Sequence, residues 1–260
     1  MTTGITASGT FYSYNKIEGS IPIVFIHGVG LTNEIWEPQL DFFKKYSTIS
    51  YDILGHGKSK LEKKDISFDD FSDQLIDLID ELKINKIHLV GFSIGSLIAR
   101  NFATKFNNRL KSLILLGSIY KRTEQQQKIV SDRYDQAKQK LKLSKQALKR
   151  WFTDEYLEKN PNTYEKISSI LSANNMQNFL KVYELFVYHK NDEKFDEIKV
   201  NTLVMTGEHD VGSTVHMSQK LNEIIKNSEL EIIKNGKHLC GIECADEVNV
   251  AIKSFIDKND

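Results

Sequence analysis

The stretch Val90-Gly91-Phe92-Ser93-Ile94-Gly95-Ser96 carries the pattern Gly-x-Ser-x-Gly between an apolar run and a helical pattern. The apolar run, residues 86–90, is predicted to be a buried strand, and residues 97–103 are predicted to form a helix packed on it. A serine at such a junction is a nucleophile elbow. With Gly at ~7% and Ser taken as similar, a chain of this length gives about 0.1 chance matches. The stretch therefore predicts a nucleophilic serine at a strand–helix turn.

The chemistry of acyl transfer explains the residue types in this stretch. A serine that attacks a carbonyl must stand clear of the sheet, so the chain turns sharply and strains the backbone of Ser93. Gly91 and Gly95 let the strand and the helix pass each other without a side-chain collision. Because the helix begins at the nucleophile, its free backbone N–H groups face the negative charge that develops there.

Apolar runs alternate with helical patterns on both sides of the elbow. Further strands are predicted at residues 11–14, 21–26, 48–52, 112–116, 202–206 and 230–233. Further helices are predicted at residues 34–46, 68–82 and 215–226, and in the last segment up to Phe255. This alternation predicts an α/β fold with a mostly parallel, doubly wound sheet.

The alternation stops between residues 121 and 196, where only helical patterns occur. Lys and Gln are frequent in its first part, and aromatic residues are frequent in its second part. We expect this segment to be a helical cap, inserted into a core made of residues 1–120 and 197–260.

Composition limits the classes of function. Lys plus Arg balance Asp plus Glu at 35 each, so no global charge attracts the chain to nucleic acid or to a membrane. The first residues lack the features of a signal peptide, and no apolar run approaches the ~20 residues that span a bilayer. Cys240 and Cys244 are too few for a disulfide framework or a zinc site, and we expect buried thiols in a cytoplasmic protein.

A serine nucleophile needs a base to take its proton and an acid to orient that base. Asp210 follows a predicted strand, and His238 follows the next strand and a glycine, so both are candidates at strand ends. Glu208 is the nearest alternative to Asp210. The other histidines outside the early loops are expected in the core (His88) or at the surface (His189, His209, His216).

The tetrahedral intermediate of acyl transfer needs two N–H donors for its oxyanion. Ile94, directly after the nucleophile, is placed to supply one, and Val29 in the loop His27-Gly28-Val29-Gly30 is placed to supply the other. We expect His27 and the segment of residues 52–56 to shape these loops rather than to react.

Several motifs together resemble the α/β-hydrolase family with a helical cap, over essentially the whole chain. A narrower resemblance, to 3-oxoadipate enol-lactonases and related esterases, rests on Gly28-Val29-Gly30-Leu31, Trp36-Glu37-Pro38-Gln39, the segment from Asp52 to Ser59, Arg150-Trp151-Phe152-Thr153 and Gly207-Glu208-His209-Asp210. The resemblance implies that Ser93, Asp210 and His238 are the catalytic triad.

We therefore expect a serine hydrolase that acts on a small-molecule carboxylic ester or lactone and needs no metal or other cofactor. An alternative enzyme on the same triad is a C–C bond hydrolase of ring-cleavage products. An alternative of another class is a ligand receptor of low turnover. The sequence leaves the oligomeric state open.

The cap is expected to supply the substrate pocket. Residues 121–150 contain ten Lys or Arg against three Asp or Glu. One hypothesis is that Arg150 reaches the pocket and pairs with a substrate carboxylate, while aromatic side chains hold the apolar carbons. The aromatic candidates are Trp151, Phe152, Phe179 and Tyr183. The alternative is that the cations form a solvated helix face, since some recur at helical spacing: Lys138, Lys142, Lys145 and Lys149.

Overall fold

An eight-stranded sheet forms the centre of the computed structural model, which describes residues 1–139 and 144–260. Its strand order is β1-β2-β4-β3-β5-β6-β7-β8. The strands are β1 (Thr2–Ile5), β2 (Phe11–Asn15), β3 (Ile23–Ile26), β4 (Thr48–Tyr51), β5 (Ile87–Phe92), β6 (Leu110–Leu116), β7 (Thr202–Gly207) and β8 (Ser228–Ile233).

The sheet is mostly parallel. Only the pairs β1–β2 and β2–β4 are antiparallel, and every other neighbouring pair runs parallel. β1 was not expected from the sequence, because its residues are mostly exposed and carry no apolar alternation. The predicted fold class is confirmed, and the carboxyl ends of six strands, β3 to β8, lie at one edge of the sheet.

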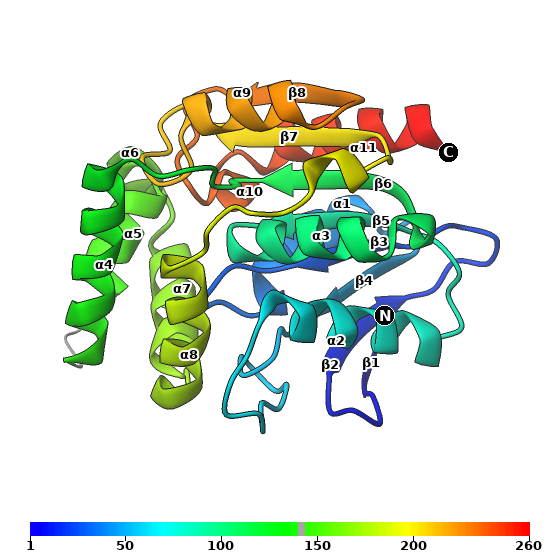
Figure 1. Cartoon of the computed structure of the whole chain (residues 1–260), viewed down its shortest axis with the longest axis horizontal. Helices are drawn as coiled ribbons and strands as arrows, with labels where there is room; N and C mark the ends of the chain where they lie inside the picture. The colour runs from blue at the N-terminus through cyan, green and yellow to red at the C-terminus, as the bar shows by residue number, and fades with distance from the viewer. Residues whose placement is uncertain (140–143) are drawn as a thin grey trace.

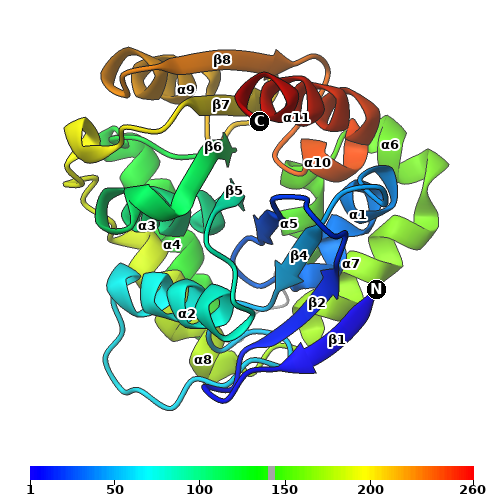
Figure 2. The same cartoon turned by 90° about the vertical axis from the view of Figure 1, so that its right-hand side faces the viewer.

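Alternate residues of the central strands pack on opposite faces of the sheet. In β5, Leu89 belongs to the apolar cluster on one face, and Val90 and Phe92 belong to the cluster on the other. The first face is covered by α2 (Phe68–Glu81), α3 (Ile94–Lys105) and α9 (Val215–Ile224). The second is covered by η1 (Asn33–Trp36), α1 (Glu37–Phe42), α10 (Cys240–Glu243) and α11 (Ala245–Asn259). Figure 2 shows these two layers on either side of the twisted sheet.

The described residues between β6 and β7 form five α-helices, which we call the inserted helices, and one short 3-10 helix after them; another short 3-10 helix lies between α3 and β6. The inserted helices are α4 (Glu124–Lys138), α5 (Ser144–Trp151), α6 (Asp154–Lys159), α7 (Pro161–Ser172) and α8 (Met176–Val187); the 3-10 helices are η2 (Asn107–Arg109) and η3 (Phe195–Glu197). α4 packs on α8, and α5 packs on α7. Figure 1 shows the inserted helices gathered beyond one end of the strands. Their place over the carboxyl ends of the strands puts them above Ser93.

Local sequence explains where several helices begin. Thr123 begins α4, because its Oγ1 accepts the backbone N–H of Gln126 at 3.2 Å while the Gln126 side chain accepts the N–H of Thr123 at 2.9 Å. Pro161 occupies the first position of α7, where its missing N–H costs no hydrogen bond. Of the helices in residues 1–139 and 144–260, none has both the length and the apolar character needed to cross a membrane.

Candidate active site

Ser93 stands at the junction of β5 and α3 with φ 56° and ψ −119°. A non-glycine residue in this region of backbone space is strained, and such strain gathers at functional sites. Its N–H donates to the carbonyl of Leu116 at 3.0 Å, and its own carbonyl accepts the N–H of Ser96 at 2.9 Å. The Ser96 hydroxyl donates to the same carbonyl at 2.5 Å. These bonds hold the turn from both sides.

The two glycines of the elbow are required by close backbone approach. A Cβ at Gly91 would lie 2.3 Å from the carbonyl oxygen of Gly95, and a Cβ at Gly95 would lie 2.4 Å from that of Ile26. No side chain fits at such distances from backbone atoms. Strand and helix therefore cross where only hydrogen atoms fit between them.

Ser93, His238 and Asp210 come together from the ends of three strands. His238 Nε2 lies 3.2 Å from Ser93 Oγ, and His238 Nδ1 lies 2.6 Å from Asp210 Oδ2. Because a carboxylate only accepts, the Nδ1–H donates to Asp210, and Nε2 is left to accept the serine proton. A serine, an imidazole and a carboxylate connected in this order have the geometry that acyl transfer on a serine requires.

Asp210, rather than Glu208, is the carboxylate that bonds to His238. The Asp210 carboxylate is buried, and its Oδ1 accepts the N–H groups of Gly212 at 2.7 Å and Ser213 at 2.9 Å. Glu208 is exposed and accepts the N–H of Asn235 instead, at 3.1 Å. The turn after β7 thus fixes Asp210 toward His238.

The two backbone groups expected to hold an oxyanion are uncommitted. Within the described residues, the N–H of Val29 and the N–H of Ile94 donate to no other group. Val29 lines the same cavity as Ser93, and Ile94 is the first residue of α3. Free N–H groups at these two positions can stabilise negative charge beside the serine.

Two neutral imidazoles shape the loop that carries Val29. His27 Nε2 accepts the N–H of Ile53 at 3.0 Å, and its Nδ1 bonds to the carbonyl of Gly28 at 2.8 Å. His56 Nε2 accepts the N–H of Gly30 at 2.8 Å. Burial lowers the pKa of His27 to about 4 and that of His56 to about 3, so both rings stay neutral and can accept these bonds.

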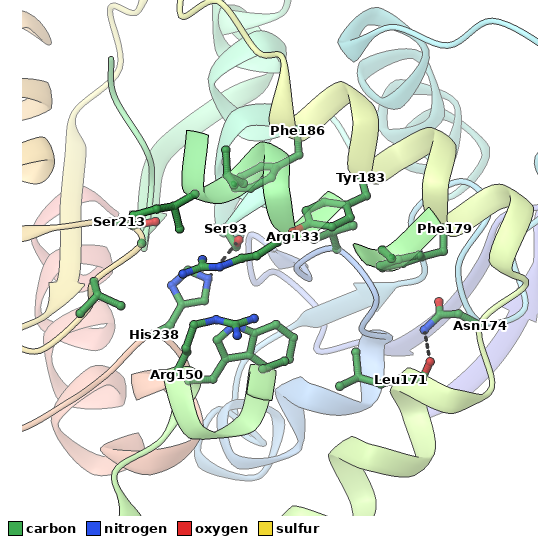
Figure 3. Close-up of a pocket in the computed structure, with 18 of the residues that line it drawn as sticks. Ser93, Arg133, Arg150, Leu171, Asn174, Phe179, Tyr183, Phe186, Ser213 and His238 are labelled. Carbon is green, nitrogen blue, oxygen red and sulfur yellow. Dashed lines mark hydrogen bonds between the residues drawn. The ribbon is translucent and has the colours of Figure 1, made fainter. Parts of the chain in front are cut away.

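A cavity of about 750 Å³ opens beside Ser93, Asp210 and His238. Its walls include side chains from the core loops and from the inserted helices, as Figure 3 shows. Three of the four aromatic residues named from the sequence line it: Trp151, Phe179 and Tyr183. Phe186 lines it as well and was not foreseen.

Phe152 does not line this cavity, contrary to the expectation from the sequence. Its side chain is 0% exposed and belongs to the apolar cluster of the second sheet face. Its ring stacks on Tyr156, with centroids 5.3 Å apart. Phe152 directly follows α5 and its N–H still donates to the carbonyl of Leu148 at 3.0 Å, so it continues the last helical turn and its side chain projects about 100° away from that of Trp151.

Arginine side chains give the cavity a positive wall. Arg150 lines it, together with Arg122 and Arg133, which the sequence analysis did not single out. Figure 3 shows Arg133 and Arg150 extending into the cavity near Ser93 and His238. Burial and the neighbouring charge of Arg133 both lower the pKa of Arg150.

The cavity arginines have no carboxylate partner among the residues that the structure describes. Within the described residues, arginine–carboxylate ion pairs join Arg100 to Glu193 and Arg109 to Asp80, and none involves a cavity arginine. Arg122 instead donates to backbone carbonyls, at 3.3 Å to Phe186 and 3.0 Å to Val187. A positive wall without a carboxylate partner favours an anionic ligand.

Helical spacing is the sequence signal that could have identified Arg133 as a cavity residue. One face of α4 lines the cavity with Gln126, Val130, Arg133 and Ala137, which recur every three or four residues. The solvated face expected in this region also exists, since Lys138 and Lys149 are exposed. Lys142 and the side chain of Lys145, named with them, lie outside the described residues.

The remaining histidines are placed as expected with one exception. His88 is buried and bonds to Ser112 at 2.7 Å through Nδ1, while His209 and His216 are exposed. His189 was expected at the surface, but its side chain is 6% exposed. A hydrogen bond of 3.0 Å to Glu193 compensates its burial.

The two cysteines are free thiols, one buried and one half-buried. Cys240 is fully buried and burial raises its pKa, while burial raises the pKa of half-buried Cys244 to about 11. The described residues contain no group of three or more His, Cys, Asp or Glu side chains arranged to bind a metal ion.

Known proteins resemble this chain over nearly its full length. It is 30% identical over 262 residues to the (E)-2-((N-methylformamido)methylene)succinate hydrolase of Acinetobacter baylyi, covering 98% of this chain and 97% of the relative. It is 26% identical over 237 residues to 3-oxoadipate enol-lactonase 2 of the same organism, covering 91% of this chain and 88% of the relative.

Solved structures share the fold. The crystal structure of the enol-lactonase from Burkholderia xenovorans LB400 superposes with a TM-score of 0.90 at 22% identity, covering 98% of this chain and 100% of that one. The family described as alpha/beta hydrolase fold matches residues 21–243. The chain belongs to this family of hydrolases.

Proposed function

We propose that this chain is a serine hydrolase that cleaves small carboxylic esters or lactones through an acyl-enzyme on Ser93. The observation that carries the proposal is the hydrogen-bonded series Asp210–His238–Ser93, with distances of 2.6 and 3.2 Å, at the wall of a large cavity. A buried acid, a base in the correct tautomer and a strained serine are what nucleophilic attack on a carbonyl requires.

The reaction follows from these positions. His238 Nε2 takes the proton of Ser93 Oγ as that oxygen attacks the carbonyl carbon, and the N–H groups of Val29 and Ile94 stabilise the oxyanion. His238 then gives the proton to the leaving oxygen, and the acyl-enzyme forms. Water, deprotonated by His238, releases the acid and restores Ser93. Asp210 stays ionised throughout and stabilises the imidazolium.

The substrate carries a carboxylate in this proposal. Arg133 and Arg150 share the cavity with Ser93 and lack carboxylate partners among the described residues, so their mutual repulsion is relieved when an anion binds between them. The names of two relatives agree with an anionic substrate, because a methylenesuccinate and a 3-oxoadipate enol-lactone both bear carboxylate groups.

Residues 121–196 act as the cap in this proposal, and residues 1–120 with 197–260 act as the hydrolase core. The cap supplies the arginines and the aromatic wall of Trp151, Phe179 and Tyr183, while the core supplies the reacting groups. Substrate selection and chemistry are thereby assigned to different parts of the chain.

The test combines covalent labelling with a substrate panel. A fluorophosphonate probe should label the wild-type protein at Ser93, and the Ser93→Ala variant should lose both labelling and turnover. The panel contains esters, lactones and ring-cleavage products, because C–C bond hydrolysis is the alternative activity on the same triad. Wild-type turnover by Ser93→Ala would refute the proposal, and a slowly released stoichiometric adduct would indicate a receptor instead.

A further inference from the structure

A single buried arginine touches both segments that connect the inserted helices to the sheet. Arg100 lies on α3, the helix that begins beside Ser93, and its side chain is 0% exposed. The incoming segment, residues 117–123, leads from β6 to α4, and the outgoing segment, residues 188–201, leads from α8 to β7. We call these the two connecting segments.

Each of the two terminal guanidinium nitrogens of Arg100 bonds to one connecting segment. Nη1 donates to the carbonyl of Ile119 at 2.7 Å and to Ser118 Oγ at 3.2 Å, both on the incoming segment. Nη2 donates to Asn191 Oδ1 at 3.2 Å and forms an ion pair with Glu193, both on the outgoing segment. The two segments are far apart in sequence, so this side chain joins what the backbone does not.

The outgoing segment is shaped to meet Arg100. Asn191 has φ 52°, a left-handed conformation that asparagine tolerates better than most residues. His189 bonds to Glu193 at 3.0 Å, and its ring packs edge-on against Phe68 of α2, with centroids 4.8 Å apart. The ring of Phe195 lies 4.9 Å from the guanidinium carbon. Contacts within the segment, together with Phe68 of the core, thus hold it around the arginine.

Stability alone does not account for this pair. Removing two charges from water offsets much of their attraction, and apolar pairs of similar volume are often as stable. The Glu193 side chain is only 7% exposed. Burial by itself raises the pKa of Glu193, but the hydrogen bond from His189 and the charge of Arg100 bring it to about 2, so the pair stays ionised. Unlike an apolar pair, this ion pair fixes the relative orientation of α3 and the outgoing segment, because its hydrogen bonds are directional.

The geometry points to Arg100 as a positioning residue that clamps both connecting segments onto the nucleophile helix and so sets the distance between the cap and Ser93. The cavity needs this distance fixed, because Ser93 comes from the core while Arg150 and Tyr183 come from the inserted helices. A substrate that touches both parts depends on the clamp, and a substrate that touches only Ser93 and its neighbours does not.

The kinetic test compares a long and a short substrate. The long one is the p-nitrophenyl half-ester of adipic acid, whose free carboxylate extends toward the inserted helices, and the short one is p-nitrophenyl acetate. The paired variant Arg100→Met/Glu193→Leu should melt closer to the wild type than Arg100→Met alone. Its KM for the half-ester should rise about tenfold, because small misplacements cost binding and orientation. Its kcat/KM for the acetate should stay within about twofold.

Arg109→Met is the matched control, because the partners of Arg109 within the described residues are core groups, the carbonyls of Ile84 and Asn85 and the carboxylate of Asp80. This variant should leave the ratio of kcat/KM for the half-ester to kcat/KM for the acetate unchanged. An unchanged ratio in a folded paired variant would show that Arg100 serves stability only and would overturn the inference.

Hydrogen exchange tests the clamp without any substrate. Peptides from residues 117–123 and 188–196 should lose protection together in the wild type, with the same dependence on denaturant. Because Tyr120 also packs against Phe195 across the two segments, with centroids 5.8 Å apart, the paired variant Arg100→Met/Glu193→Leu is compared with Arg109→Met. Both peptides should lose protection at a lower denaturant concentration in the paired variant, because Arg100 bonds to both segments in the wild type. Independent exchange of the two segments would overturn the inference. The kinetic arm rests on the proposed function, but this arm does not. A wild-type protein with no esterase activity but with coupled exchange of the two segments would therefore reject the proposed function and support the role of Arg100.

Discussion

Ser93 has a backbone conformation that most residues avoid, and hydrogen bonds to neighbouring residues compensate the strain. Its φ of 56° persists because hydrogen bonds to Leu116 and from Ser96 fix the backbone on both sides. The strain lifts the hydroxyl out of the sheet toward His238, at 3.2 Å. The backbone conformation of Ser93 therefore fixes the direction in which its side chain points.

Replacing Asp210 by Asn should leave the fold intact and lower kcat by on the order of 10⁴. The Asn amide cannot stabilise the imidazolium, and its N–H₂ group can select the wrong tautomer of His238. Steady-state kinetics with p-nitrophenyl acetate and a melting curve would measure both effects. Glu208→Gln is the control, because Glu208 is exposed and bonds to Asn235. Equal losses in both variants would argue against Asp210 as the orienting acid.

Replacing Arg150 by Met should raise KM for anionic substrates by one to two orders of magnitude, roughly 1.5–3 kcal/mol, since a carboxylate in the cavity loses a charged partner. Arg133→Met should act in the same direction. The measurement compares the p-nitrophenyl half-ester of adipic acid with its neutral methyl ester, which should respond little to either substitution.

Lys149→Met controls for the loss of a positive charge on α5, because Lys149 is exposed beside Arg150 in sequence. It should change neither KM. If Arg150→Met weakened the charged and the neutral substrate equally, Arg150 would be a packing residue, and the reading would return to a general esterase.

At the scale of elements, the crossing of β5 and α3 sets the precision of the site. Gly95→Ala should destabilise the protein by about 3 kcal/mol or more, because its Cβ would lie 2.4 Å from the carbonyl oxygen of Ile26 and the backbone cannot yield without moving β3. Urea unfolding would measure the loss. Gly241→Ala is the matched control, since its Cβ meets only the Leu116 side chain, at 3.4 Å. A Gly95→Ala variant as stable as this control would mean that the crossing can open.

α4 serves two surroundings at once. Arg133 and Ala137 face the cavity, while Lys128 and Asp132 pair with each other on the solvent side at 2.8 Å. The polar composition of α4 does not reveal which of its faces lines the cavity, because that face also carries polar side chains, Gln126 and Arg133. Periodicity, and not composition, separates the two faces.

At the scale of the whole molecule, buried neutral histidines link folding to pH. His27 and His56 have pKa values of about 4 and about 3 in the folded chain, against the ordinary value of 6.5. As pH falls below about 6.5, the unfolded chain binds protons that the folded chain cannot, so stability is lost on the acid side. The loss for each ring ends once pH falls below its folded pKa.

The free energy of unfolding should thus fall between pH 6.5 and pH 4, by up to about 1.4 kcal/mol per pH unit for each of the two rings. Urea unfolding at several pH values would give the slope. His56→Gln should have a shallower slope by about one proton, and His209→Gln, which changes an exposed ring, should have the wild-type slope. A slope that His56→Gln leaves unchanged would mean that other groups govern acid unfolding.

Local signals in the sequence determined the fold class and selected Ser93, Asp210 and His238 as candidates for the reacting groups. The elbow around Ser93 and the alternation of strands and helices suffice for the fold, because both depend on short-range patterns of residue type. The candidates Asp210 and His238 follow from strand ends, since parallel strands bring their carboxyl ends to one edge. The structure brings these residues into hydrogen-bonding distance.

Only the tertiary structure decided which side chains face the cavity and how the inserted helices are attached. Phe152 points into the core although Trp151 beside it lines the cavity, and Arg133 joins Arg150 from another helix. Arg100 meets Glu193 across 93 positions of the sequence. Such contacts depend on the rotation and docking of whole helices, which arise from the sum of many distant packing contacts, so no local pattern contains them.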